Sequence, residues 1–164
     1  ETDAEQGGVV LGICGGLQIL GEALIDTHGI DGNAAGLGLL PVVTQFAVSK
    51  TVQRTHAQFG ELRGAWSALS GVAVSGYEIH HGQTQAHVAM VAAGQVVHEV
   101  MPNLAWQNDA GNVMGSYLHG LFENPAVLQA LFGAQVPTLD TVFEGLADYI
   151  DQHVGAEVLR SLIA

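Results

Sequence analysis

The chain has 164 residues, 48% of them hydrophobic, with 16 acidic against four basic residues and a formal net charge of −12. This length suits one domain with a single core, and the negative charge argues against nucleic acid or anionic membranes as partners. No apolar run approaches the roughly 18 residues of a membrane span. The single cysteine cannot form an internal disulfide, so we expect a cytoplasmic protein.

A strand and a helix are predicted at the start of the chain. The run Val9 to Ile13 is short and apolar, as is typical of a buried strand. Three leucines then recur at helical spacing, namely Leu17, Leu20 and Leu24. Cys14 falls between these elements, so the only thiol of the chain is expected on a sharp turn from strand to helix.

Glycines on both sides of Cys14 indicate a nucleophile elbow. Side chains at Gly12, Gly15 and Gly16 would obstruct the strained dihedrals and close backbone approach of such a turn. A thiol at a helix N-terminus also favours the thiolate form. The alternative is a buried structural cysteine, although core packing does not require flanking glycines.

The middle of the chain is expected to be antiparallel, with strands around Thr51 to Phe59 and Gly76 to Met90. Surface loops are expected over Thr27 to Leu39 and Gly60 to Ser70, where glycines and mixed polarity interrupt the apolar pattern.

The segment from Ser75 to Thr84 contains the adjacent pair His80 and His81. Strand alternation would put Glu78 and His80 on one face. The opposite face would carry Tyr77, Ile79 and His81. Zinc usually takes four ligands in close pairs, and one cysteine with one histidine pair does not supply them, so no metal is expected. Glu78 and His80 are instead expected to support the floor of the site through hydrogen bonds.

A thiol nucleophile needs a base, and His119 is the best candidate among eight histidines. The run Val113 to Leu118 is predicted to be a strand, so His119 lies at its carboxyl end, where Gly120 lets the chain leave. Catalytic groups gather at the carboxyl ends of strands in open α/β sheets. Cys14 and His119 are therefore expected at one edge, although 105 residues separate them.

From Thr138 onward, apolar residues recur at mostly helical spacing, which predicts one or two amphipathic helices closing the domain. These residues are Phe143, Leu146, Ile150, Val154, Val158 and Leu162. Residues 1–164 are thus expected to form one α/β domain, with a mainly parallel central sheet flanked by helices and an antiparallel portion.

Three segments, in this order, resemble the class I-like glutamine amidotransferase domain of cobyric acid synthases. They are Gly12 to Gln18, Gly76 to Gly82 and Tyr117 to Phe122, and the stretch Gly36 to Val42 followed by Lys50 and Thr51 agrees. The first segment alone fits any class I glutamine amidotransferase, whereas the second narrows the resemblance to this branch. The similarity covers almost the whole chain.

The resemblance implies that Cys14 attacks the side-chain carbonyl of glutamine and that His119 moves the proton from the thiol to the departing ammonia. The N–H of Gly15 would stabilise the oxyanion, and Gln18 would contact the bound glutamine. Most triads of the wider family carry a glutamate two residues after the histidine, where this chain has Leu121. The sequence therefore leaves open which group acts as the third member of the catalytic triad.

The acceptor that orients His119 is expected to be either a backbone carbonyl or a distant carboxylate such as Glu78. The nearer Glu123 is expected to point elsewhere, because it follows the histidine by four residues rather than two.

The resemblance also implies partners. Ammonia would pass to an ATP-dependent synthase domain that amidates carboxylates of a corrin, adenosylcobyrinic acid a,c-diamide, in cobalamin biosynthesis. ATP and magnesium would belong to that domain, with no cofactor in this one. Because the family fold places strands and a glycine-containing oxyanion loop before the elbow, we expect the chain to be the C-terminal part of a longer protein.

Other interpretations of the sequence remain open. The motifs around the cysteine are similar in the amidotransferase domains of cobyrinic acid a,c-diamide synthase and of the lipid II amidating complex. A different class of function is a non-catalytic interaction or redox module, in which Cys14 titrates without turning over.

Overall fold

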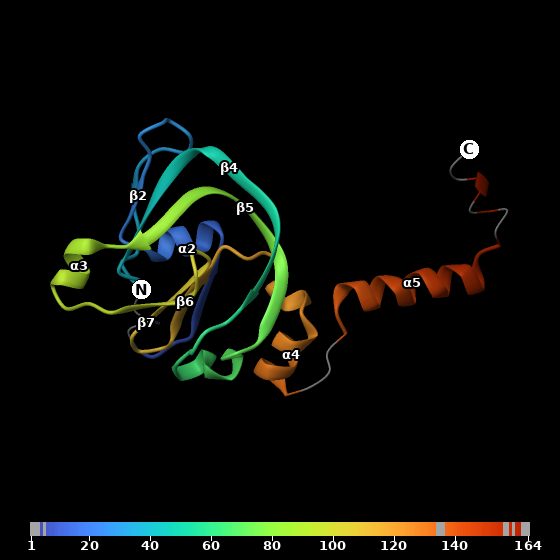
Figure 1. Cartoon of the computed structure of the whole chain (residues 1–164). Coiled ribbons are helices and arrows are strands. Elements are labelled where there is room, and N and C mark those ends of the chain that lie inside the picture. The colour runs from blue at the N-terminus through green and yellow to red at the C-terminus, as the bar shows by residue number, and fades with distance from the viewer. Residues whose placement is uncertain (1–3, 5, 134–136, 156–157, 159, 162–164) are drawn as a thin grey trace.

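The structure, a computed structural model, describes residues 4, 6–133, 137–155, 158 and 160–161. These residues form two four-stranded sheets with short helices around them (Figure 1). One sheet has the strand order β1-β8-β7-β6, and the other has the order β3-β2-β4-β5. The α/β fold expected from the sequence is confirmed.

The strands of the second sheet are consecutive in the chain and lie between the first strand and the other three strands of the first sheet. The first sheet contains β1 (Val10–Ile13), β6 (Val97–Met101), β7 (Ala105–Asn108) and β8 (Val113–Ser116). The second contains β2 (Ala23–Ile25), β3 (Ala34–Ala35), β4 (Val42–Gln58) and β5 (Ala73–Ala86). Parallel pairing joins β1 to β8 and β2 to β4, whereas the other strand pairs are antiparallel. The antiparallel portion is thus larger than expected.

Some of the helices connect these strands, and the others follow the last strand. The helices are α2 (Gly15–Leu20), α3 (Val88–Ala92), α4 (Pro125–Phe132) and α5 (Leu139–His153), with the 3-10 helices η1 (Gly64–Leu69) and η2 (Leu121–Glu123). The two expected surface loops therefore contain β3 and η1. None of the helices in the described part of the chain is long and apolar enough to cross a membrane.

The strands β4 and β5 form a long curved pair that arches over α2 (Figure 1). Their register shifts between Phe46 and Thr51, which marks an irregularity in the curve. The strand predicted to reach Met90 ends at Ala86. His87 ends it by capping α3, since its side chain accepts a hydrogen bond from the N–H of Met90 at 3.2 Å.

The helix predicted to reach Leu24 ends at Leu20, and Leu24 belongs to β2. Gly21 is extended, and a Cβ built there would lie 2.8 Å from the carbonyl oxygen of Val42. The N–H of Glu22 donates to the same oxygen at 2.8 Å. The close approach of β4 therefore stops the helix, which leucine spacing alone does not reveal.

A single core is formed by side chains from both sheets and from α2, η1 and α4. Fully burying a large apolar side chain stabilises a fold by about 1.5–3 kcal/mol relative to leaving it exposed. The largest fully buried side chains include Leu17, Leu40, Phe59, Leu69, Met101, Met114, Tyr117, Leu118 and Leu121. Several of them lie next to the predicted site residues, so the site rests on the core.

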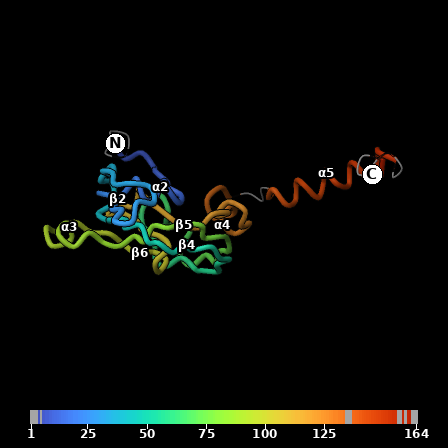
Figure 2. The backbone as a smooth tube through the Cα atoms, turned by 90° about the horizontal axis from the view of Figure 1, so that it is seen from above, coloured from blue at the N-terminus to red at the C-terminus, as the bar shows by residue number. Residues whose placement is uncertain are grey.

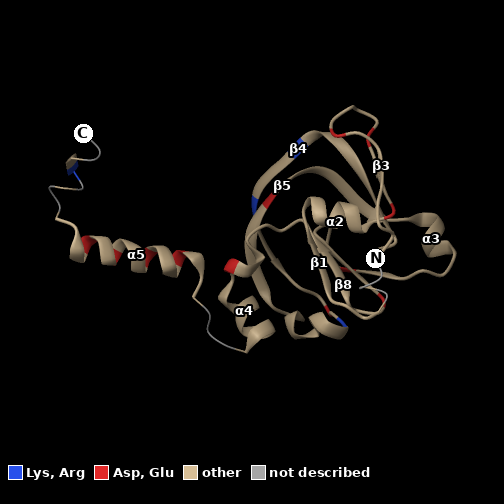
Figure 3. Cartoon of the chain, turned by 180° about the vertical axis from the view of Figure 1, so that it is seen from behind, with Lys and Arg blue, Asp and Glu red and all other residues tan. Residues whose placement is uncertain are grey.

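The helix predicted in the tail is present as α5, but it stands away from both sheets (Figures 1 and 2). Most of its apolar residues are exposed, and Phe143 is 60% exposed. The expectation that this helix closes the domain is therefore wrong, because periodicity shows an apolar face without showing what covers it. Its other face carries Asp140, Glu144, Asp148 and Asp151 (Figure 3). Leu162, the last apolar residue of the predicted series, lies outside the described residues.

Candidate active site

Cys14 lies on the turn between β1 and α2 with φ 54° and ψ −110°, a conformation that non-glycine residues rarely adopt. Its N–H donates to the carbonyl of Ser116 at 2.7 Å, which anchors the turn to β8. Its carbonyl accepts from the N–H of Gln18 at 3.2 Å and closes the first turn of the helix. The strained elbow expected from the sequence is present, and the thiol is partly exposed.

One of the three glycines around Cys14 is required by its neighbours. A Cβ at Gly12 would lie 2.6 Å from both the carbonyl carbon of Gly16 and the Cδ1 atom of Leu20. A Cβ at Gly15 or Gly16 would meet nothing within 4 Å. The expectation that side chains at these two positions would obstruct the turn is therefore wrong, because both positions border open space.

The start of α2 faces this open space. Within the described part of the chain, no backbone carbonyl accepts a hydrogen bond from the N–H of Gly15. The first turn of the helix contains no acidic side chain to offset the partial positive charge of its N-terminus. An unpaired N–H directly after a thiol can stabilise negative charge that develops on a substrate oxygen.

His119 is held by its main chain against β5. Its N–H donates to the carbonyl of Tyr77 at 2.9 Å, and its carbonyl accepts from the N–H of Tyr77 at 3.1 Å. A Cβ at Gly76 would lie 2.1 Å from the carbonyl oxygen of His119, so only glycine permits this approach. Gly120 has φ 78°, and the chain turns away there as expected.

The thiol of Cys14 lies at the same edge of β5, where it donates to the carbonyl of Ile79 at 3.6 Å. Tyr77 and Ile79 are two residues apart, and alternate residues of a strand direct their N–H and C=O groups to the same side. Cys14 and His119 thus meet one strand edge, as their positions at the carboxyl ends of β1 and β8 predict.

The imidazole of His119 has no carboxylate partner among the described residues, and its buried Nε2 atom has no hydrogen-bond partner there. Glu78 does not reach it, because that carboxylate accepts hydrogen bonds from other side chains. Glu123 points elsewhere, as expected, and accepts from the N–H of Leu139 at 3.1 Å. Leu121, at the position of the usual glutamate, is buried in the core.

Glu78 and His80 form the expected hydrogen-bonded support on the buried face of β5. The carboxylate of Glu78 accepts from Gln53 at 2.8 Å and from the hydroxyl of Thr55, and it pairs with Nε2 of His80 at 3.3 Å. Burial raises the pKa of Glu78, but the hydrogen bonds from Thr55, Gln53 and His80 outweigh burial and lower it below its ordinary value. Nδ1 of His80 contacts the carbonyl of Gly82 at 2.7 Å.

Gln18 is only 8% exposed, so it is not an ordinary amide on the helix surface. A Cβ at Gly82 would lie 2.5 Å from Nε2 of Gln18 and 2.7 Å from the hydroxyl oxygen of Tyr117. The amide and the phenol therefore share a narrow space beneath β5, one helical turn from Cys14.

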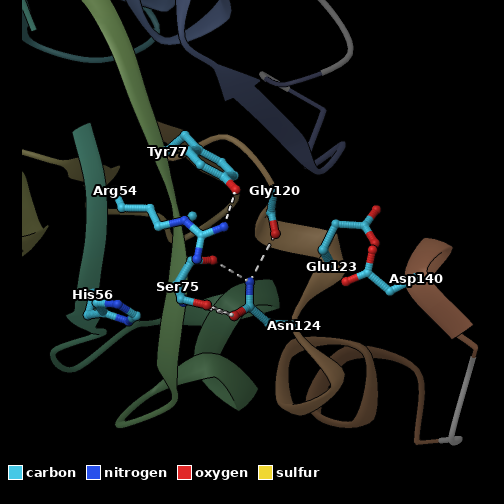
Figure 4. A pocket seen from close by; sticks show the side chains of 9 residues that line it. Arg54, His56, Ser75, Tyr77, Gly120, Glu123, Asn124 and Asp140 are labelled. Carbon is cyan, nitrogen blue, oxygen red and sulfur yellow. Dashed lines mark hydrogen bonds between the residues drawn. The ribbon is translucent and has the colours of Figure 1, made fainter. Parts of the chain in front are cut away.

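A pocket of about 320 Å³ borders His119 through Gly76, Tyr77 and Gly120 (Figure 4). Arg54 donates to the hydroxyl of Tyr77 at 2.7 Å and lies 5.1 Å from the centre of its ring, a cation–π contact. The other lining residues are polar, namely His56, Ser75, Glu123, Asn124 and Asp140. Asn124 ties the pocket together, because its amide bonds to the main chain of Ser75 and of Gly120.

Sequence reasoning missed two parts of this site. One is the edge of β5, where Ile79 offers a carbonyl rather than a side chain and so leaves no sequence signal. The other is the contact of Gln18 with Tyr117. Tyr117 belongs to the segment Tyr117 to Phe122, in which the sequence predicted a role only for His119. Over the described residues, no group of three or more His, Cys, Asp or Glu side chains is arranged to hold a metal ion.

An α/β fold with a strained cysteine elbow and a histidine just after the neighbouring strand is typical of amidotransferase domains that carry a thiol. The family model of the CobB/CobQ-like glutamine amidotransferase domain matches residues 1–127. The chain belongs to this family, and the resemblance inferred from its three motifs is confirmed.

The similar proteins narrow the family to one branch. The chain is 74% identical over 162 residues to a cobyric acid synthase of Polaromonas sp. (strain JS666) and 68% identical over 162 residues to that of Polaromonas naphthalenivorans (strain CJ2). It is 69% identical over 149 residues to the cobyric acid synthase of Paracidovorax citrulli. These matches cover 98%, 98% and 91% of this chain but 32%, 33% and 30% of the relatives. The chain therefore spans about a third of the length of the curated relatives it matches.

Proposed function

We propose that this chain is the glutamine-hydrolysing module of a cobyric acid synthase. The observation that carries the proposal is the shared edge of β5, which holds the main chain of His119 and the thiol of Cys14 two residues apart along one strand. The high identity to cobyric acid synthases supports this branch over cobyrinic acid a,c-diamide synthase and the lipid II amidating complex.

In the proposed reaction, the sulfur of Cys14 attacks the side-chain carbonyl carbon of glutamine while the imidazole of His119 takes the thiol proton. The carbonyl oxygen becomes an oxyanion, which the N–H of Gly15 stabilises. The carbon–nitrogen bond then breaks, and His119 returns the proton to the leaving ammonia. A water molecule, deprotonated by His119, cleaves the resulting thioester to glutamate and restores the thiol.

The third member of the site is proposed to be the main chain rather than a carboxylate. The paired hydrogen bonds between His119 and Tyr77 fix the histidine backbone, and Leu121 leaves no carboxylate at the usual position. Among the described residues, no carboxylate or other side chain bonds to the buried Nε2 atom of His119, so the main chain is the remaining candidate.

The partners of this module are proposed from its relatives, which are about three times as long as this chain. We infer that an ATP-dependent synthase domain, with ATP and magnesium, receives the ammonia and amidates carboxylates of adenosylcobyrinic acid a,c-diamide in the cytoplasm. No cofactor is proposed for the chain itself.

A glutamine-analogue diazoketone tests the proposal on the full-length protein. A formed glutamine pocket should direct the reagent to Cys14, with one adduct per chain by mass spectrometry and protection by glutamine. Iodoacetamide, which needs only an accessible thiol, serves as the control. Labelling by iodoacetamide without labelling by the diazoketone would instead identify a redox or interaction module.

A further inference from the structure

Tyr117 is held in one position by its neighbours. Its side chain is 1% exposed, and its ring stacks on His80 with a centroid distance of 3.8 Å. Trp106 contacts the same ring edge-on at 6.2 Å, and the N–H of Tyr117 donates to the carbonyl of Leu104 at 2.8 Å. Since His80 is itself bound to Gly82, the phenol has little freedom to move.

A chain of buried hydroxyl groups meets this phenol. The hydroxyl of Tyr117 lies 2.6 Å from that of Thr84, which lies 2.7 Å from that of Thr44. The amide of Gln18 lies beside the same phenol, because a Cβ at Gly82 would lie 2.5 Å from Nε2 of Gln18 and 2.7 Å from the hydroxyl oxygen of Tyr117. Burial raises the pKa of Tyr117, the neighbouring polar groups of Thr84, Gln18 and Thr44 oppose that rise, and a negative charge on Cys14 adds to it. The phenol therefore remains protonated in the working enzyme.

A polar chain of this kind is costly to bury unless each group is satisfied. Phenylalanine and valine would fill the same space without that requirement. This series of hydroxyl groups leads to Gln18, the polar side chain of α2, which lies one turn after Cys14 and is buried. The position of Gln18 therefore gives a reason for polar groups at these buried positions.

We propose that Tyr117 is a positioning residue whose buried hydroxyl fixes the side-chain amide of Gln18 against the bound glutamine. Nε2 of Gln18 lies on the phenol side, beside Gly82, which leaves the amide oxygen to accept from an N–H of the substrate. This inference rests on the proposed glutaminase function and adds to it the group that orients the substrate contact.

The test is glutamine hydrolysis by the full-length protein with Tyr117→Phe, which keeps the stacked ring and removes the hydroxyl. The KM for glutamine should rise about 3- to 10-fold, as expected for one lost hydrogen bond, while kcat changes less than about 2-fold. Amidation with free ammonia should be unchanged. Tyr149→Phe, on the exposed surface of α5, is the matched control and should leave both constants unchanged.

A double-mutant cycle separates positioning from general support of the fold. If Tyr117 acts through Gln18, Tyr117→Phe should add nothing to the higher KM of Gln18→Ala. Additive effects, or an unchanged KM in Tyr117→Phe, would overturn the inference while leaving the proposed function intact. A wild-type protein without glutamine turnover would overturn the proposed function instead. Thr84→Val removes the next hydroxyl and gives a decisive second variant, with the same direction of change expected.

Discussion

Tyr77 and His119 exchange two main-chain hydrogen bonds, at 2.9 and 3.1 Å, where the edge of one sheet meets the end of a strand of the other. Gly76 makes this contact possible, because any side chain there would collide with the carbonyl of His119. The contact between the two sheets therefore fixes the position of the His119 main chain. The pairing uses only main-chain atoms of His119 and does not involve its imidazole.

Cys14→Ala in the full-length protein should abolish amidation that uses glutamine and leave amidation that uses ammonia largely intact. The reason is that the thiol forms the thioester in this module, whereas the proposed synthase domain uses ammonia directly. Both activities are measured as corrin amide formation with either nitrogen source. Equal loss of the two would mean that Cys14 supports folding or the synthase site, and the assignment as nucleophile would fail.

His119→Asn should lower glutamine hydrolysis by roughly 10²-fold or more, the usual contribution of a positioned acid–base group. The main-chain bonds to Tyr77 do not depend on the imidazole, so the melting temperature should change little. Glutaminase rate and thermal denaturation are measured on the same preparation. Near-normal turnover would move the role of base to His80 or His81.

Glu78→Gln should change the pH dependence of stability. The pKa of Glu78 is lowered in the folded state from its ordinary value of 4.5, so the carboxylate stabilises the fold fully above about pH 4.5. That contribution is lost as the pH falls through the lower folded pKa. The melting temperature of the wild type should exceed that of Glu78→Gln at neutral pH, and the gap should narrow in acid.

The control for this comparison is Glu61→Gln, which alters an exposed carboxylate. Its melting temperature should follow that of the wild type across the pH range. A gap for Glu78→Gln that stays constant from neutral pH to acid would show that the carboxylate contributes through shape rather than charge.

The sequence was most informative where the chemistry is local. An apolar run before Cys14 and glycines around it predict a strained turn, because a few adjacent residues decide its conformation. Alternation likewise predicted that Glu78 and His80 share one face, which is the buried face of β5. Residues 14 and 119 could be paired because strand ends in α/β sheets converge.

The remaining features depend on contacts between distant segments. The register shift between Phe46 and Thr51 decides which hydroxyl of β4 faces Thr84, and no local pattern reports it. The pairing of Tyr77 with His119 joins two sheets through the backbone, which side-chain patterns do not reveal. The apolar face of α5 predicted a helix correctly but gave no information about its place outside the core.

Gly12→Ala and Gly16→Ala should have opposite effects on stability. A Cβ at Gly12 would lie 2.6 Å from the carbonyl carbon of Gly16 and from Cδ1 of Leu20, so the elbow must shift, at a cost of about 1–3 kcal/mol. Position 16 has open space and lies within α2, where alanine is favoured over glycine by up to about 1 kcal/mol. Thermal denaturation should show a lower melting temperature for Gly12→Ala and an equal or higher one for Gly16→Ala. The same loss in both variants would mean that the glycines around Cys14 act together through backbone freedom, and that the contact of Gly12 with the helix is not what holds the turn.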